Sequence, residues 1–238
     1  MKLNLYGIIV LNLLFTSCKH ELEHPLIPYG DDTHTPFIPC PDSIIDIDGN
    51  VYKVIDVDGT CWTTSNLTVS RFSNGDSIPT VALGENWIQL TTSAQCFYEN
   101  DSANLNIYGR LYNGYAASDS RGVCPTGWAV PHDSDWVNMA NYLGGESIAG
   151  DKLKTLDLWY GPGTPATDEI GFSAKPGGDR IIQGNGSFGS LTNMGNWWTL
   201  TESGSEVLKN RYITYANSFV LAANNSKKLG FSIRCIRK

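Results

Sequence analysis

Apolar and polar residues alternate along residues 44–57, where side chains such as Ile45 and Ile47 are separated by polar ones. Alternation with a period of two is typical of strands that bury one face. Asp48-Gly49 and Asp58-Gly59 punctuate the segment with residue pairs that favour tight turns. The pattern therefore predicts strands joined by tight turns at the start of the folded region.

A helix is predicted directly after Pro131. Trp136, Ala140 and Leu143 recur at i, i+4 and i+7, which gives one apolar stripe, and acidic residues precede them where the helix dipole favours negative charge. Gly144-Gly145 supplies a stop signal, because glycine adopts the left-handed conformation of a helix end. A second short helix is expected over residues 150–155.

The end of the chain is predicted to be rich in strands, around Trp197-Trp198, over residues 211–220 and over residues 231–236. Two short helices among many short, mostly antiparallel strands and long glycine-rich loops predict an α+β fold. No linker interrupts the sequence after residue 43. Residues 43–238 are therefore expected to form one domain.

The first residues have the pattern of an export signal. An apolar run over residues 5–15 follows Lys2 and is shorter than the ~20 residues that span a bilayer. Leu14-Phe15-Thr16-Ser17-Cys18 resembles a lipobox, so residues 1–17 are interpreted as a lipoprotein signal peptide and Cys18 as the lipid-bearing residue. Lipid on Cys18 would hold the exported protein to a membrane, at the outer membrane or the cell surface.

A tether is predicted between the signal and the domain, because residues 18–42 contain five prolines. Within it, His20-Glu21-Leu22-Glu23-His24 matches the H-E-x-x-H pattern of zinc proteases. That chemistry needs both histidines on one face of a positioned helix, and Pro25 and Pro28 follow at once. We therefore expect no metal site in this segment.

Charge and residue types argue against several classes of function. The net charge is −7 and no dense basic block is present, which disfavours nucleic acid as a partner. His132 is the only histidine after residue 43, so a typical zinc site or a histidine pair for catalysis is not expected. No glycine-rich loop has the P-loop form. We expect neither a cofactor nor an enzyme.

Disulfides are expected in an exported protein of this composition. Five cysteines follow Cys18, which is an odd number, so one of them is expected to be free or to pair outside the chain. They are Cys40, Cys61, Cys96, Cys124 and Cys235. The sequence leaves the pairing of Cys40, Cys61 and Cys96 open.

Many short motifs occur in a characteristic order from about residue 46 to the end of the chain. They are Asp48-Gly49-Asn50-Val51-Tyr52-Lys53, Trp62, Asn66-Leu67, Asn74-Gly75-Asp76-Ser77-Ile78-Pro79, Tyr108-Gly109-Arg110-Leu111-Tyr112-Asn113, Cys124-Pro125-Thr126-Gly127-Trp128-Ala129-Val130-Pro131, Trp136, Lys152-Leu153-Lys154, Trp159, Gly171-Phe172-Ser173-Ala174, Pro176-Gly177-Gly178, Trp197-Trp198-Thr199, Thr201-Glu202 and Gly230-Phe231-Ser232-Ile233-Arg234-Cys235. In this order and spacing they resemble the Fibrobacter succinogenes major paralogous domain.

The resemblance implies an exported protein or lipoprotein with a fold like the C-type lectin domains of formylglycine-generating enzymes. It supplies no catalytic residues. Because the chain ends of a lectin-like fold lie close together, it also implies a disulfide between Cys124 and Cys235.

Binding is the function that these observations favour, with a glycan or an envelope protein as the ligand. In the expected strand over residues 211–220, Ile213 and Tyr215 would point inward and the alternate residues outward. The outward residues and asparagines of neighbouring turns make the candidate ligand-binding surface. Its members are Tyr212, Thr214, Ala216, Asn193, Asn196, Asn217, Asn224 and Asn225. The alternative is a structural or assembly component of an envelope or fibre complex.

Overall fold

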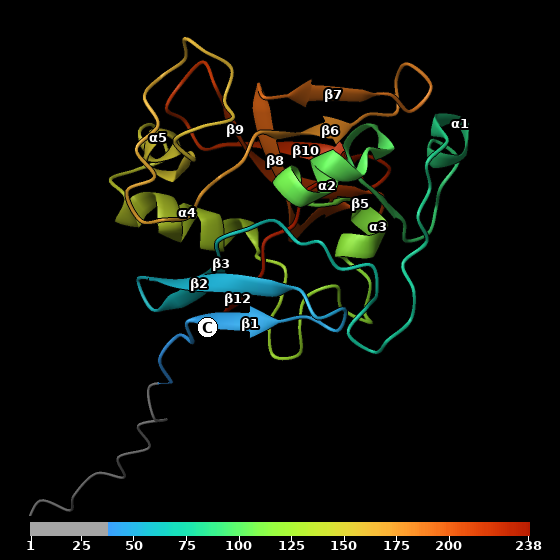
Figure 1. Cartoon of the computed structure of the whole chain (residues 1–238), viewed down its shortest axis with the longest axis horizontal. Helices are drawn as coiled ribbons and strands as arrows, with labels where there is room; N and C mark the ends of the chain where they lie inside the picture. Colours follow the sequence, from blue (N-terminus) through green and yellow to red (C-terminus); the bar gives the residue numbers. More distant parts are fainter. Residues whose placement is uncertain (1–37) are drawn as a thin grey trace, which may run out of the picture. The chain divides into compact units, whose positions relative to one another are not determined.

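Two sheets of mostly antiparallel strands form the framework of residues 39–238 (Figure 1). This computed structural model describes residues 38–238, and Cys18 lies outside them. The strands are β1 (Ser43–Ile45), β2 (Val51–Val57), β3 (Thr60–Thr63), β4 (Gln95–Cys96), β5 (Leu111–Asn113), β6 (Gly177–Arg180), β7 (Phe188–Leu191), β8 (Met194–Gly204), β9 (Val207–Thr214), β10 (Leu221–Ser226), β11 (Gly230–Phe231) and β12 (Ile236–Arg237).

The smaller sheet has the strand order β1-β2-β3-β12, and the larger has the order β10-β9-β8-β6-β11-β5-β4, with β7 paired to β6. The first three strands are those that the alternating pattern predicted, and the turns at Asp48-Gly49 and Asp58-Gly59 connect them. The last strand, β12, pairs with β3, so it belongs to the same sheet as the first three strands. An α+β fold is confirmed.

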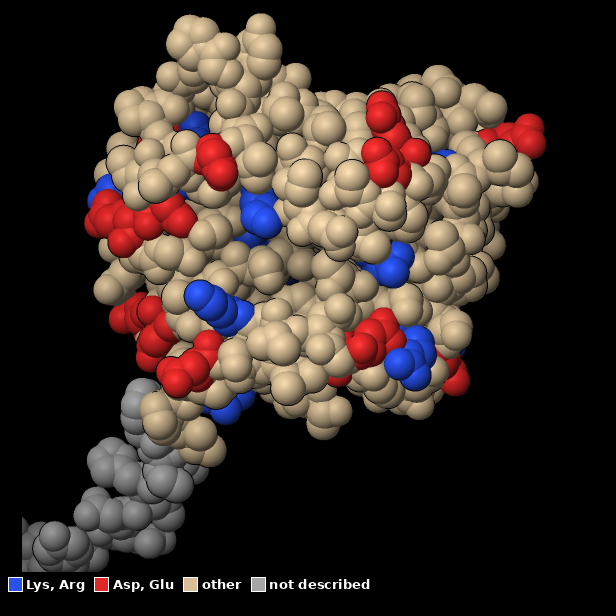
Figure 2. Space-filling model, viewed as in Figure 1, with Lys and Arg blue, Asp and Glu red and all other residues tan. Residues whose placement is uncertain are grey.

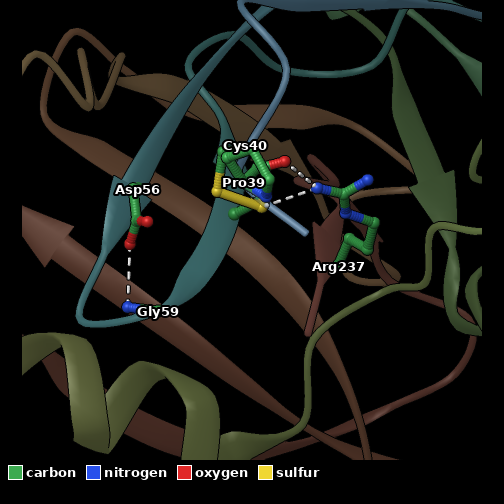
Figure 3. The surroundings of a disulfide bond; sticks show 6 residues. Pro39, Cys40, Asp56, Gly59 and Arg237 are labelled. Atoms are coloured by element: carbon green, nitrogen blue, oxygen red, sulfur yellow. Dashed lines mark hydrogen bonds between the residues drawn. A yellow bond between two sulfur atoms is a disulfide. The ribbon is translucent and has the colours of Figure 1, made fainter. Parts of the chain in front are cut away.

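A disulfide joins the start of the compact unit to the smaller sheet (Figure 3). Cys40 is bonded to Cys61 in β3, and the guanidinium of Arg237 donates to the carbonyl of Pro39 at 2.6 Å. The compact unit begins at Pro39, four residues before the position at which the sequence pattern places the start of the domain. Residues 39–42 are thus attached to the sheet by covalent and polar contacts.

A second disulfide crosses the interior between Cys124 and Cys235, which are separated by 111 residues. It is the pair that the family resemblance implied. Cys96 is the one free cysteine of the described residues, and its side chain is fully buried. Burial raises the pKa of the Cys96 thiol to about 11, so this thiol stays protonated and unreactive at neutral pH.

Five α-helices are present in residues 38–238, where the sequence pattern predicted two. They are α1 (Gly84–Trp87), α2 (Ser102–Tyr108), α3 (Gly114–Ala117), α4 (Asp133–Tyr142) and α5 (Ala149–Leu153), and a 3-10 helix spans Tyr98–Asn100. The two predicted helices are α4 and α5, at close to their expected positions. None of the helices in this part of the chain is long and apolar enough to cross a membrane.

Helix α4 packs between the two sheets through its apolar stripe (Figure 1). The Trp136 ring meets Trp62 of β3 at 5.2 Å and Trp197 of β8 at 5.4 Å between ring centroids. On its polar side, Asp133 accepts hydrogen bonds from Lys209 and Arg211 of β9. These contacts fix one face of β9 against the core and leave its other face for the site described below.

Strand β9 differs from the expected strand over residues 211–220, because it begins at Val207 and ends at Thr214. Ile213 is fully buried as expected, whereas Tyr215 is only half-buried, next to the ring of Tyr160. The chain turns after Thr214, and the side chain of Asn217 stabilises this turn by accepting a hydrogen bond from the Phe219 amide at 3.0 Å. Strand β10 then returns along β9.

Candidate functional site

A cavity of about 410 Å³ opens on the face of β9 that points away from α4. It lies over neighbouring strands of the larger sheet, where β8, β9 and β10 run side by side and β6 borders β8. Its lining residues are Asp179, Ile181, Ile182, Gln183, Met194, Asn196, Asn210, Tyr212, Ala223, Asn225, Ser226, Leu229 and Phe231. A volume of this size is within the range of small-molecule binding sites.

Three asparagines from three neighbouring strands form a continuous chain of hydrogen bonds along one wall. The amide of Asn225 donates to Asn210 Oδ1 at 2.7 Å, and the amide of Asn210 donates to Asn196 Oδ1 at 3.2 Å. The chain is possible because residues two apart on a strand share a face, so the cross-strand diagonals bring these side chains together. We call this row the amide chain.

The amide chain ends on the carboxylate of Asp179 in β6. Asn196 Nδ2 donates to Asp179 Oδ2 at 3.3 Å, while Asp179 Oδ1 is buried and has no hydrogen-bond partner among residues 38–238. Only 8% of Asp179 is exposed. Burial raises the pKa of this carboxyl, and the neighbouring Ser190 side chain only partly opposes the shift. A buried carboxyl with an unused acceptor can receive a hydrogen bond from a ligand.

Part of the cavity lining is apolar. It includes Ile181, Ile182, Met194, Leu229 and Phe231. Tyr212 adds an aromatic ring directly across from Asn196 in the β8–β9 register. A cavity with both a polar row and apolar side chains matches ligands that carry both hydroxyl groups and carbon-bound hydrogen, as sugars do.

The structure brings together three of the residues that the sequence analysis selected for ligand binding. Asn196, Tyr212 and Asn225 all line the cavity. Asn196 is almost fully buried rather than part of an exposed turn, because it lies within β8.

The other selected residues lie outside the cavity. Asn224 faces the opposite side of β10, where it accepts a hydrogen bond from the Ser203 hydroxyl, and Asn193 is exposed in the turn before β8. Ala216 and Asn217 belong to the turn after β9, and the Thr214 hydroxyl is buried without a partner. The expected continuous patch is therefore divided, since β9 ends earlier than its sequence indicated.

Two members of the site were missed as ligand-binding candidates, Asp179 and Asn210. The sequence contains a signal for the first of them in the pair Gly177-Gly178, which precedes it. Gly178 has φ +67°, and a Cβ atom there would lie 2.4 Å from the Gly189 carbonyl oxygen. Only glycine permits this close approach of β6 and β7, and the approach places Asp179 in the cavity wall.

The described residues contain no group of three or more His, Cys, Asp and Glu side chains placed to hold a metal ion. His132 lies at the N-terminus of α4 and does not line the cavity. The chemistry that the cavity offers is hydrogen bonding by amides and a carboxyl group, together with apolar contact.

Comparisons with known proteins add the family of the chain. Neither the curated proteins nor the solved structures gave a match. The model of the Fibrobacter succinogenes major domain matches residues 55–237, which include every strand from β3 to β12 and all five helices. With most of its length matched, this chain belongs to the Fibrobacter succinogenes major domain family.

Proposed function

We propose that this protein is a non-catalytic binding module that holds a glycan in the cavity beside the amide chain. The observation that carries the proposal is the row Asn225–Asn210–Asn196–Asp179, which ends on a buried carboxyl oxygen without a partner. Neutral amides and a carboxyl group with spare acceptors suit a ligand that is rich in hydroxyl groups.

The geometry supports binding because its polar groups are already in place. Asn196 and Asn210 are at most 3% exposed, and their side chains are held by one another. Groups that are fixed before the ligand arrives lose little conformational entropy on binding. The Tyr212 ring and the apolar lining residues would cover the carbon face of a sugar.

The proposal extends to the cellular setting and the fold. The protein would be an exported lipoprotein, attached by lipid on Cys18 to the outer membrane or the cell surface, with the compact unit beyond the tether. Its fold would be of the C-type lectin-like kind. Metabolic labelling with a fatty-acid probe tests the anchor: label on the wild type and none on Cys18→Ser is expected, and label that persists in Cys18→Ser would contradict it.

A glycan array with the purified compact unit tests the binding function. Any sugar that binds is then titrated against Asn225→Ala and Asn224→Ala, which alter neighbouring residues on opposite faces of β10. We expect affinity to fall by about tenfold for Asn225→Ala, since the cavity loses one polar group that can form a hydrogen bond with the ligand. Affinity should stay unchanged for Asn224→Ala. Equal affinities for the two variants would place the sugar elsewhere.

The alternative of an assembly component is favoured by one observation. Ile45 and Val51 are opposite each other in the β1–β2 pair, each is 63% exposed, and β1 is an edge strand. Exposed apolar residues on an unpaired edge can receive a second chain. Capture of one envelope protein by the wild type and not by Ile45→Lys, with no hit on the glycan array, would support this role over glycan binding.

A further inference from the structure

A second hollow of about 640 Å³ lies apart from the amide-chain cavity and shares no residue with it. It runs between the segment that follows β3 and the end of α2, and we call it the α2 groove. Its lining is mainly polar, with hydroxyl and amide groups from Ser65, Thr68 and Asn106, and two cationic side chains, Lys175 and Arg110, border it. Figure 2 shows blue side chains around the hollowed centre of this face, with red ones further out.

Lys175 has no acidic partner among residues 38–238. Its Nζ donates to the Ile107 carbonyl at 2.6 Å, which leaves two further N–H donors. Burial lowers the pKa of Lys175, and the charge of Arg234 lowers it further. The ammonium group is therefore incompletely solvated and incompletely neutralised.

Within the described part of the chain, Arg110 is also paired with neutral groups only. Its Nε donates to the Thr68 carbonyl at 2.7 Å and its Nη1 to Gln95 Oε1 at 2.6 Å, so Nη2 keeps its donors. The two hydrogen bonds fix the guanidinium at the edge of the groove.

A third cation lies behind the groove wall. Arg234 is fully buried and donates to Asn66 Oδ1, a groove residue, and to three backbone carbonyls, all of them neutral acceptors. Its charge is thus not cancelled by a contacting carboxylate, and in a poorly hydrated environment it acts over a longer distance.

Four acidic side chains lie near these cations. Two of them are Asp46, which accepts a hydrogen bond from Tyr52 of the groove, and Asp168, which is close enough to Arg234 to raise its pKa. Asp48 lines the groove, but it is held by Arg71 at 2.5 Å and by the Ser70 amide and hydroxyl. Asp157 is exposed and close enough to Lys175 to raise its pKa. None of the four forms an ion pair with Lys175 or Arg110 within residues 38–238, so the remaining donors of both cations are available to a ligand.

We propose that the α2 groove binds the oxyanion of an acidic saccharide, a carboxylate or a sulfate group, through the free donors of Lys175 and Arg110. The polar lining of the groove would then contact the sugar hydroxyls. The site is independent of the amide-chain cavity, because the chemistry differs and the residues are separate.

Calorimetric titration with three probes tests the proposal: a uronic-acid oligosaccharide, a sulfated oligosaccharide and a neutral one of equal length. We expect one or both acidic probes to bind at low salt. Neither should bind at high salt, since added ions screen the attraction. The neutral probe is expected not to compete. If the two acidic probes fail to bind at low salt, or if the neutral probe competes equally, the proposal is wrong.

Variants separate this groove from nonspecific charge. Lys175→Gln and Arg110→Gln should each weaken binding by at least about tenfold, because a charge-assisted hydrogen bond is lost. Lys53→Gln removes the same charge from an exposed residue outside the groove and should have little effect. Asp157→Asn removes an opposing charge and should strengthen binding.

Thermal unfolding of each variant shows whether it is still folded. If Arg110→Gln is unfolded, Asp157→Asn still tests the proposal, because it is expected to strengthen binding. Equal weakening by Lys53→Gln and Lys175→Gln would contradict a defined site. A site in the amide-chain cavity would instead respond to Asn225→Ala, so failure of either proposal can be recognised separately.

Discussion

Arg234 in the core and Asp179 in the cavity lining are both buried ionisable side chains, but they differ in how many hydrogen bonds they make. Neither side chain has an ion-pair partner in the part of the chain that the structure describes. Arg234 nevertheless makes four hydrogen bonds of 2.8–2.9 Å and stacks over the Phe172 ring at 4.5 Å. Within residues 38–238, Asp179 accepts one hydrogen bond at 3.3 Å, and its other oxygen accepts none.

The difference indicates what each side chain is for. A buried charge that makes four hydrogen bonds to different segments ties these segments together, and removing it leaves several acceptors unsatisfied. A buried carboxyl that is only partly satisfied costs stability and gains its partner when a ligand arrives.

Arg234→Met should give the largest loss of stability, about 3–5 kcal/mol, because the buried acceptors around the guanidinium lose their donor. Denaturant unfolding measures it. Lys152→Met is the control, since Lys152 forms a partly exposed ion pair with Glu169, and such pairs contribute about 0–1 kcal/mol. Similar losses of unfolding free energy for the two variants would show that the hydrogen bonds of Arg234 do not stabilise the core.

Ile213→Ala and Tyr212→Ala alter neighbouring residues on the two faces of β9. Ile213 is fully buried under α4, so its truncation should cost about 2–5 kcal/mol. Tyr212 lines the cavity, and its truncation should lower stability less and weaken ligand binding. The reverse order of stabilities, measured by denaturant unfolding, would mean that the faces of β9 are misassigned.

Much of the framework could be predicted from local pattern, because the responsible signals are adjacent in sequence. The α4 helix follows from its apolar stripe and the Gly144-Gly145 stop, and the β1–β2–β3 turns follow from Asp-Gly pairs. Helix α2 was missed because its seven residues, Ser102–Tyr108, are too few to show a stripe, and its N-terminus depends on Asp101, which accepts the Ala103 amide.

The cavity could be predicted only in part. Asn196, Tyr212 and Asn225 were selected because they lie in or near one expected strand. Asp179 joins them through the parallel pairing of Gly178 with Gly195, a contact between β6 and β8 that no local pattern encodes. The early end of β9 was missed because the turn relies on a side-chain contact of Asn217.

Thr214→Val should give the smallest effect. The Thr214 hydroxyl is buried and, like Asp179 Oδ1, has no hydrogen-bond partner among residues 38–238, but it does not line the cavity. Replacing it by a methyl group removes an unsatisfied polar group and should raise stability by up to about 1 kcal/mol, while ligand binding stays unchanged. A change in affinity would extend the site to this residue.

The unfolding free energy of Asp179→Asn at pH 7, compared with that of the wild type, tests most directly whether this carboxyl is kept for a ligand. Burial raises the folded-state pKa of Asp179, so the folded protein binds its proton more tightly than the unfolded chain does. The wild type therefore loses stability as the pH rises from the unfolded-state pKa through the folded-state pKa.

At pH 7 the asparagine variant, which lacks this penalty, should be more stable than the wild type by about 0.5–2 kcal/mol, and the difference should shrink on acidification. The same variant should bind the ligand more weakly. A variant that is less stable than the wild type at pH 7 would show that Asp179 is a structural residue, and would contradict the assignment of the cavity as a binding site.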